Sequence, residues 1–205
     1  MKRKVITALL AATMVASLAV GCGNKGGDSK SDSSKSSSSD EITIGFSQVG
    51  AESDWRTANS ESMKSTFSEK NGYKLIFDDA QQKQENQITA IRNFIQQDVD
   101  YIVLAPVTET GWDTVLKEAK DADIPVIIVD RMIDVSDDSL YTAWVGSNFK
   151  MEGQKACEWL NAYAEAKGMK EVNIAHIQGT IGASAQIGRT EGLEEAAKEY
   201  GWNIV

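Results

Sequence analysis

The chain has 205 residues, of which 41% are hydrophobic, and it carries a formal net charge of −9 at pH 7. Such an acidic protein is a poor partner for nucleic acid, because nucleic-acid phosphates attract positively charged surfaces. The length is sufficient for one good hydrophobic core, or for one domain and part of another. With only two cysteines, Cys22 and Cys157, the chain has no basis for a disulfide framework.

The first 21 residues have the pattern of an export signal. A basic stretch at 2–4 precedes an apolar run over 5–20, which is short and rich in small residues for a membrane span. The run ends in SLAVGC (17–22), the pattern of a bacterial lipoprotein signal. We therefore expect that this segment is removed and that Cys22 is lipidated, which gives two acyl chains for stable anchoring. An ordinary signal peptide followed by an incidental cysteine is the alternative.

Residues 22–40 begin with Cys22, the residue expected to be lipidated, and continue mainly with serine, glycine, lysine and aspartate. A segment without large apolar side chains cannot bury surface, so we expect a flexible tether. Together, the signal and the tether predict an exported protein that a lipid anchors to the outer face of the cytoplasmic membrane.

From Glu41 onward, predicted strands and helices alternate. We expect strands over 42–49, 73–79, 99–107, 124–130, 140–147, 172–179 and from 202. We expect helices over 55–72, 85–97, 110–122, 148–166 and 184–201. Strands that single helices separate predict right-handed βαβ units and a mostly parallel, doubly wound α/β sheet. The strand runs are apolar throughout, as expected when helices cover both faces.

Several local signals refine these elements. Gly72 is expected to end the first helix, and Thr110 with Asp113 resembles a capping box for the third. Trp112 and Cys157 are expected to pack in the interior rather than to contact a ligand. The strand at 140–147 is shorter and more polar, which is typical of a position near a sheet edge.

Polar and aromatic side chains follow the strands at the edge where doubly wound sheets bind ligands. Trp55 and Arg56 lie in the loop after the first strand, Asp130 and Arg131 end the run IPVIIVDR, and Arg189 follows the strand at 172–179. Aspartate accepts hydrogen bonds from hydroxyls, arginine donates in a fixed fork, and tryptophan offers a flat apolar surface. This set suits a small, uncharged ligand rich in hydroxyls. An ion pair at the sheet rim is the alternative for Asp130 and Arg131.

Two further residues on this edge are candidates for ligand contact. Ser53 lies in the first loop, and Gln84 lies in the second, where capping of the following helix is equally compatible with the sequence. The chain has no HExxH motif, no paired-cysteine spacing and no nucleophile elbow. We therefore expect a protein that is not an enzyme and that has no cofactor and no metal site.

Four stretches resemble the type I periplasmic sugar-binding proteins of ABC transporters, and within that family the galactofuranose-binding type. They are GFSQVGAESDWR, DDAQQKQENQITAIRNFI, VDYIVLAPVTETGWDTVLKEAKDADIPVIIVDR and IQGTIGASAQIGRTEGLEEA. The resemblance implies that Trp55 stacks on a sugar, and that Asp130, Arg131 and Arg189 hydrogen-bond to its hydroxyls. Arg56 stands where the ribose binders of the family carry a second aromatic residue.

The resemblance also implies two similar hinged α/β domains with the sugar between them. We expect residues 41–147 to form the first domain and 148–205 to begin a second one that is truncated. The predicted function is that of a monomeric substrate-binding lipoprotein, which binds a galactofuranose-like or galactose-like monosaccharide for the permease subunits of an ABC importer. A receptor that reports a sugar or an autoinducer to a sensor kinase or chemoreceptor is the alternative, and an enzyme is the less favoured third class.

Overall fold

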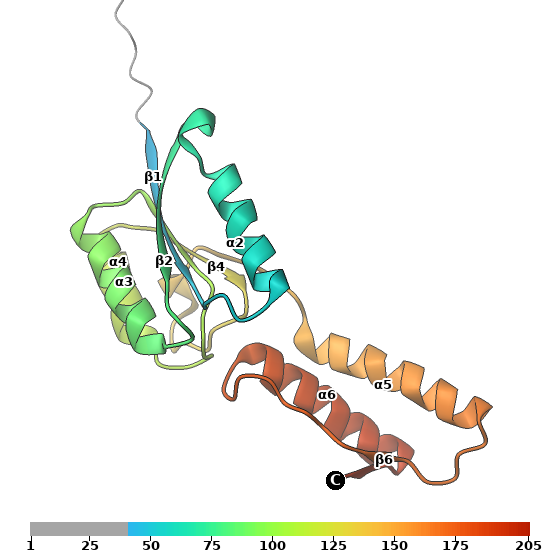
Figure 1. Ribbon diagram of the computed structural model, residues 1–205. Coiled ribbons are helices and arrows are strands. Elements are labelled where there is room, and N and C mark those ends of the chain that lie inside the picture. Colours follow the sequence, from blue (N-terminus) through green and yellow to red (C-terminus); the bar gives the residue numbers. More distant parts are fainter. Residues whose placement is uncertain (1–40) are drawn as a thin grey trace, which may run out of the picture. The chain divides into compact units, whose positions relative to one another are not determined.

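A computed structural model describes residues 41–205, so the expectations for the export signal, the tether and Cys22 lie outside the described residues. A five-stranded sheet has the strand order β2-β1-β3-β4-β5, and every neighbouring pair is parallel (Figure 1). Its strands are β1 (Ile42–Gln48), β2 (Tyr73–Asp79), β3 (Tyr101–Leu104), β4 (Val126–Asp130) and β5 (Ala143–Gly146). The predicted parallel α/β sheet is confirmed, and β5 lies at its edge as expected.

Helices cover both faces of this sheet, α2 on one side and the pair α3 and α4 on the other (Figure 1). The helices and 3₁₀ turns before β5 are α2 (Asp54–Thr66), η1 (Glu69–Asn71), α3 (Gln84–Gln96), α4 (Asp113–Asp121) and η2 (Asp138–Leu140). Alternate strand residues point to opposite faces. Accordingly, Ile102 and Leu104 pack with α3 and α4, whereas Val103 packs with the α2 side. Because helices cover both faces, side chains pointing either way are buried, and this explains why the strands are apolar throughout.

The helix expected over 55–72 is interrupted. α2 ends at Thr66, and Gly72 ends a separate 3₁₀ turn with a left-handed φ of 84°. Polar side chains cause the break, because Ser68 Oγ donates to Ser65 O (2.9 Å) and Asn71 Nδ2 donates to Thr66 O (2.9 Å). These carbonyls are thereby taken out of the helical ladder.

The capping box expected at Thr110 and Asp113 is wrong. Trp112 is the N-cap of α4, without a side-chain cap bond, and the Asp113 carboxylate instead accepts hydrogen bonds from the backbone N–H and hydroxyl of Ser136. Trp112 is fully buried in the core and donates from Nε1 to Thr108 O (2.9 Å), so its predicted packing role is confirmed.

The remaining part of the chain forms α5 (Phe149–Ala166), β6 (Asn173–Ile174), α6 (Ser184–Tyr200) and β7 (Asn203–Ile204). α5 and α6 lie side by side over a separate hydrophobic cluster that includes Cys157, whose predicted burial is confirmed. Gly201 ends α6 with φ 69°, as expected. No helix of residues 41–205 is both long and apolar enough for a membrane span.

The strand expected over 172–179 is mostly wrong, because β6 comprises only Asn173 and Ile174. β6 pairs with β7 alone among the described residues, and β7 is equally short. A strand is defined by its hydrogen-bonded neighbour, so the apolar residues of 175–179 have no ladder to join. β3 likewise covers only four residues, Tyr101–Leu104, of the run expected over 99–107.

Gly45 allows α3 to approach the centre of the sheet. A Cβ atom at this position would lie 2.4 Å from Phe94 Cγ, deep in the core. We expect Gly45→Ala to lower the free energy of unfolding by about 1–3 kcal/mol because the core would be overpacked. Urea denaturation would measure this loss. Gly179→Ala is the matched control, because a Cβ there meets open space; equal stability of the two variants would contradict the packing argument.

Asp78 on β2 carries a buried oxygen, Oδ1, that has no hydrogen-bond partner within the described chain. Burial and the neighbouring charge of Asp79 raise its pKa. Folding therefore favours protonation of Asp78 relative to the unfolded chain, and the stability associated with the protonated form is lost as the pH rises through the folded pKa.

We expect Asp78→Asn, which cannot ionise, to be more stable than the unmodified chain at neutral pH. The gain should vanish at about pH 3, where the aspartate is protonated in both states. Urea denaturation at the two pH values measures it. A gain of equal size at both would show that loss of the charge is not the cause.

Candidate functional site

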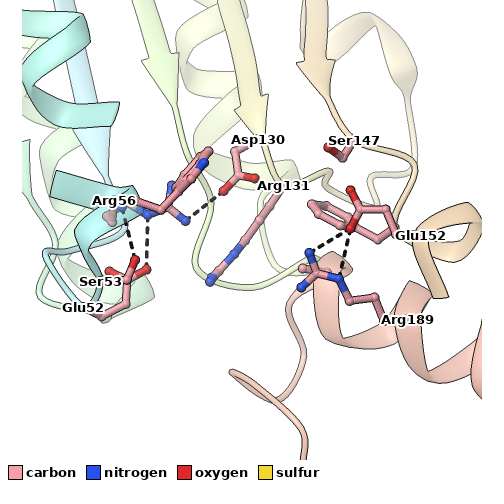
Figure 2. Close-up of a pocket in the computed structure, with 11 residues that line it drawn as sticks. Glu52, Ser53, Arg56, Asp130, Arg131, Ser147, Glu152 and Arg189 are labelled. Atoms are coloured by element: carbon pink, nitrogen blue, oxygen red, sulfur yellow. Dashed lines mark hydrogen bonds and ion pairs between the residues drawn. The ribbon is translucent and has the colours of Figure 1, made fainter. Parts of the chain in front are cut away.

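A pocket of about 360 Å³ lies at the carboxyl edge of the five-stranded sheet (Figure 2). It is lined by Glu52, Ser53, Trp55, Arg56, Asp130, Arg131, Ser147, Phe149, Glu152, Ala185 and Arg189. The lining comes from the start of α2, the end of β4, the loop after β5 and the first turns of α5 and α6. Six of the seven predicted ligand-contact residues are thus brought together, from positions up to 136 residues apart (53 to 189).

Arg56 is held on three of its nitrogens. Its side chain is only 3% exposed, and Nε donates to Glu52 Oε1 (3.1 Å) while Nη2 donates to Asp130 Oδ2 (2.8 Å). Nη1 donates to Gln48 Oε1 at 3.2 Å. The backbone N–H of the same residue is capped by Ser53 Oγ (3.1 Å), the N-cap of α2. A buried charge requires this degree of pairing, because an unpaired one would incur a large desolvation cost.

Asp130 has an unusual backbone. It is the last residue of β4 and has φ 64°, in the left-handed region that side chains other than glycine rarely adopt. Its neighbour in register on β5 is Gly146, where a Cβ atom would lie 2.1 Å from Asp130 O. Backbone strain of this kind persists only where surrounding contacts maintain it, and it concentrates at functional sites.

Arg131 is held by the backbone rather than by an acid. Its Nη1 donates to Val107 O (3.0 Å), and the N–H of Val107 donates to Oε1 of the fully buried Gln87 (2.9 Å). Burial lowers the pKa of Arg131, and so does the nearby charge of Arg56, yet a guanidinium remains cationic at neutral pH. Asp130 pairs with Arg56, so the rim ion pair considered for Asp130 and Arg131 is not what the described chain forms.

Arg189 enters the pocket from α6. Its Nη2 and Nε donate to Glu152 Oε2 (2.8 and 3.1 Å), and its guanidinium lies 5.0 Å from the centre of the Phe149 ring. α5 and α6 are in backbone contact here, because a Cβ atom on Gly153 would lie 2.7 Å from Arg189 O. The start of α6 is tied to the loop after β4, where the N–H of Met132 donates to Ser184 Oγ (2.8 Å).

Trp55 presents its ring to the pocket. The residue is 57% exposed, and the Arg56 guanidinium lies 4.8 Å from the ring centre. An indole with one free face is a suitable surface for the C–H groups of a ligand.

Gln84 does not reach this pocket. It begins α3, and its Nε2 donates to Thr110 O (2.7 Å), so it joins α3 to the loop before α4. The other five lining residues were not predicted from the sequence: Glu52, Ser147, Phe149, Glu152 and Ala185. Glu52 precedes Arg56 by four residues, a spacing typical of helical ion pairs, and could have been found. Glu152 pairs with a residue of a different helix and carried no local signal.

The pocket is lined by equal numbers of acidic and basic side chains. It contains three carboxylates and three guanidiniums: Glu52, Asp130 and Glu152, with Arg56, Arg131 and Arg189. Such a site offers many charged hydrogen-bonding groups without a net charge. It is therefore suited to an uncharged polar ligand rather than to an anion or a cation.

The sequence from residue 44 to 205 matches the family described as periplasmic binding protein domain. The chain belongs to this family. It is 52% identical over 157 residues to the galactofuranose-binding protein YtfQ of Escherichia coli, an alignment that covers 77% of this chain and 48% of that protein. It is 35% identical to the fructose import binding protein FruE of Bifidobacterium longum, over 78% of this chain and 47% of that one.

Solved structures of sugar-binding proteins also resemble this chain. A galactofuranose binding protein superposes with a TM-score of 0.75 at 48% identity, covering 80% of this chain and 54% of that one. The periplasmic component of an arabinose ABC transporter from Shewanella sp. ANA-3, bound to α- and β-L-arabinofuranose, has a TM-score of 0.74 at 51% identity, over 80% and 53% of the two chains. The predicted type I periplasmic-binding-protein fold is confirmed. The chain spans about half the length of the relatives that it matches.

We expect Asp130→Asn to lower the free energy of unfolding by about 2 kcal/mol, because the buried Arg56 loses an ionic partner. Asparagine tolerates the left-handed backbone, so the cost reports the lost charge. Chemical denaturation measures it. Asp123→Asn is the matched control, since Asp123 is exposed and has φ 60°. A control variant as unstable as Asp130→Asn would refute the ion-pair explanation.

Proposed function

We propose that this chain is the sugar-binding part of an extracytoplasmic solute-binding protein of an ABC importer, and that its pocket binds a monosaccharide in the furanose form. The observation that carries the proposal is the charge-balanced pocket with its exposed indole. The printed names of the similar proteins support it, because galactofuranose and arabinofuranose binders are about half identical to this chain.

The polar groups of the pocket have complementary roles in this proposal. Asp130 uses Oδ2 for Arg56, which leaves Oδ1 to accept a hydrogen bond from a sugar hydroxyl. Arg131 uses Nη1 for Val107 O, which leaves Nε and Nη2 as donors. Ser53 and Arg189 add donors at the two sides of the pocket. A sugar with a wrong hydroxyl pattern would leave buried polar groups unpaired, and this cost gives selectivity.

Trp55 provides the apolar contact. A furanose ring has C–H groups that pack on an aromatic face while its hydroxyls point toward the polar groups. The pocket volume of about 360 Å³ falls within the range of roughly 300–1,000 Å³ that is usual for small-molecule sites. Binding of this kind requires no nucleophile, cofactor or metal, so we propose a carrier and not an enzyme.

The assembly around the site is also part of the proposal. Residues 41–147 would form one lobe and residues 148–205 the beginning of a second, with the sugar drawing both together. The closed form would be recognised by the permease subunits of the importer, and lipidated Cys22 would retain a monomeric protein at the outer face of the cytoplasmic membrane.

Tryptophan fluorescence would test sugar binding directly. We would titrate methyl β-D-galactofuranoside, L-arabinose, D-galactose, D-ribose and D-glucose into this chain and into a fusion that adds the part of the Escherichia coli relative beyond the matched region. We expect one furanose-forming sugar to saturate the fusion at micromolar or lower concentration. Trp55→Ala should weaken the binding about tenfold or more, because it removes a stacking surface.

Trp159→Ala is the matched control for this titration, because Trp159 is similarly exposed (67%) and lies outside the pocket lining. It should leave the affinity unchanged. A folded fusion that binds none of the five sugars would overturn the proposed function.

A further inference from the structure

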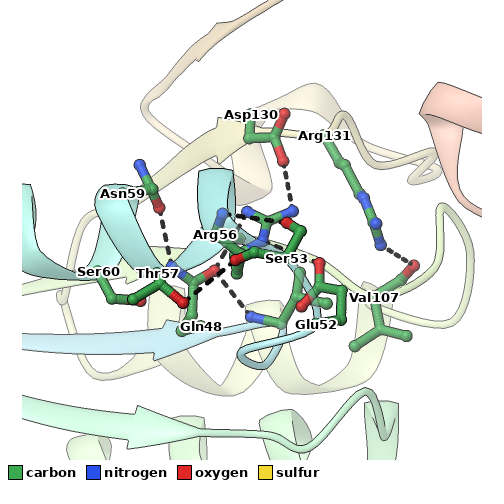
Figure 3. A network of polar contacts seen from close by, with 12 residues as sticks. Gln48, Glu52, Ser53, Arg56, Thr57, Asn59, Ser60, Val107, Asp130 and Arg131 are labelled. Atoms are coloured by element: carbon green, nitrogen blue, oxygen red, sulfur yellow. Dashed lines mark hydrogen bonds and ion pairs between the residues drawn. The ribbon is translucent and has the colours of Figure 1, made fainter.

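Gln48 is a fully buried polar residue at the end of β1, in a polar network that includes the pocket residues Arg56 and Asp130 (Figure 3). Its amide makes four hydrogen bonds. Nε2 donates to Asn59 Oδ1 (2.8 Å) and Ser60 Oγ (3.1 Å) on α2. Oε1 accepts from the backbone N–H of Val49 (3.0 Å) and from Arg56 Nη1 (3.2 Å).

These four bonds use the full capacity of a primary amide, which has two donor hydrogens and two acceptor lone pairs. The orientation of the Gln48 amide is therefore unique. If the amide turned by 180°, its NH₂ group would face the N–H of Val49 and the guanidinium of Arg56. All three are donors, so none of them could form a hydrogen bond there. In a buried site, such unsatisfied donors are costly.

The contact with Arg56 differs from the other two contacts of that guanidinium. Glu52 and Asp130 are its ionic partners, and both are more exposed (23% and 18%) than the arginine itself. Charge attraction alone would let the guanidinium shift or turn between two carboxylates. Gln48 accepts a hydrogen bond from the third nitrogen, Nη1, on the interior side. Three acceptors around the planar guanidinium therefore define the plane of this group as well as its position.

Gln48 does not line the pocket and cannot act on a ligand directly. Among the described residues that line the pocket, the Gln48 side chain bonds to Arg56 alone, and Arg56 in turn donates to Oδ2 of Asp130. We propose that Gln48 is a positioning residue, which fixes the guanidinium of Arg56, and through it the carboxylate of Asp130, in the orientation that binds sugar. This inference deepens the proposed function and rests on it for the identity of the ligand.

The first arm of the test needs no ligand. In Gln48→Met, the side chain keeps about the same length but loses the two N–H donors and the carbonyl acceptor of the amide. We expect NMR of the ¹⁵N-labelled chain to show separate Nη signals for Arg56 in the unmodified protein, and averaged signals in Gln48→Met because the guanidinium rotates. The signals of Arg92, which is paired with Glu118 (2.8 and 2.9 Å), should not change.

Gln87→Met is the matched control for this arm. Gln87 is an equally buried glutamine, but its amide bonds to Ala105 O and to the N–H of Val107, not to Arg56. The Arg56 signals should therefore stay separate in this variant. Separate Arg56 signals in Gln48→Met would overturn the positioning role, and so would averaged ones in Gln87→Met.

The second arm is a double-mutant cycle on sugar affinity, measured in the fusion described above. We expect Gln48→Met to weaken binding about tenfold, the effect of losing a hydrogen bond to a charged group. In an Arg56→Met background the same change should cost much less, because the residue through which Gln48 acts is absent. An equal loss in both backgrounds would show that Gln48 acts otherwise.

The two arms separate failure of this inference from failure of the proposed function. If the unmodified fusion binds no sugar while Arg56 loses its fixed orientation in Gln48→Met, the proposed function is overturned and the positioning of Arg56 by Gln48 is supported. If the fusion binds sugar and the Arg56 signals are unaffected by Gln48→Met, the sugar-binding function is supported and the positioning role is overturned.

Discussion

The geometry of the pocket depends on the contacts of the buried Arg56 guanidinium with Gln48, Glu52 and Asp130. This guanidinium joins three elements, because Gln48 ends β1, Arg56 lies in the first turn of α2 and Asp130, 74 residues further along the chain, ends β4. A cation that is only 3% exposed needs partners for its charge and its N–H groups. If these elements separated, the buried guanidinium would lose those partners, which would be strongly destabilising. The same contacts that make burial tolerable also define the geometry of the pocket.

The position of this cluster follows from the sheet. Parallel strands end at one edge, and the helices that connect them begin there, so strand ends and helix N-termini meet in the same place. In this chain, the strand order leaves β1 and β4 separated by β3 alone. The left-handed backbone of Asp130, accommodated by Gly146 on β5, turns the carboxylate toward Arg56. Local strain and a charged pair thus occur together at this edge, whereas the two faces of the sheet are packed with apolar side chains.

The other side of the pocket is built differently. Arg189 is about half exposed and is held by Glu152 and the Phe149 ring, on two helices that touch through Gly153. Exposed ion pairs are weak, so the contact between Arg189 and Glu152 contributes less to stability than the buried contacts of Arg56. One arginine of the pocket is thus fixed by buried partners, whereas the other is held by a partly exposed one.

The alternation of strands and helices, the parallel sheet and six of the pocket residues could be predicted from the sequence. Apolar runs, helical spacing and polar strand ends are local patterns, and Trp55, Asp130 and Arg131 stand where those patterns change. The pairing of charges depends on the folded chain, because Asp130 pairs not with adjacent Arg131 but with Arg56, 74 residues away. The extent of the strands depends on folding too, since a strand requires a neighbour. The role of Gln48 also lay beyond local patterns, since a buried amide is defined by the partners that folding brings to it.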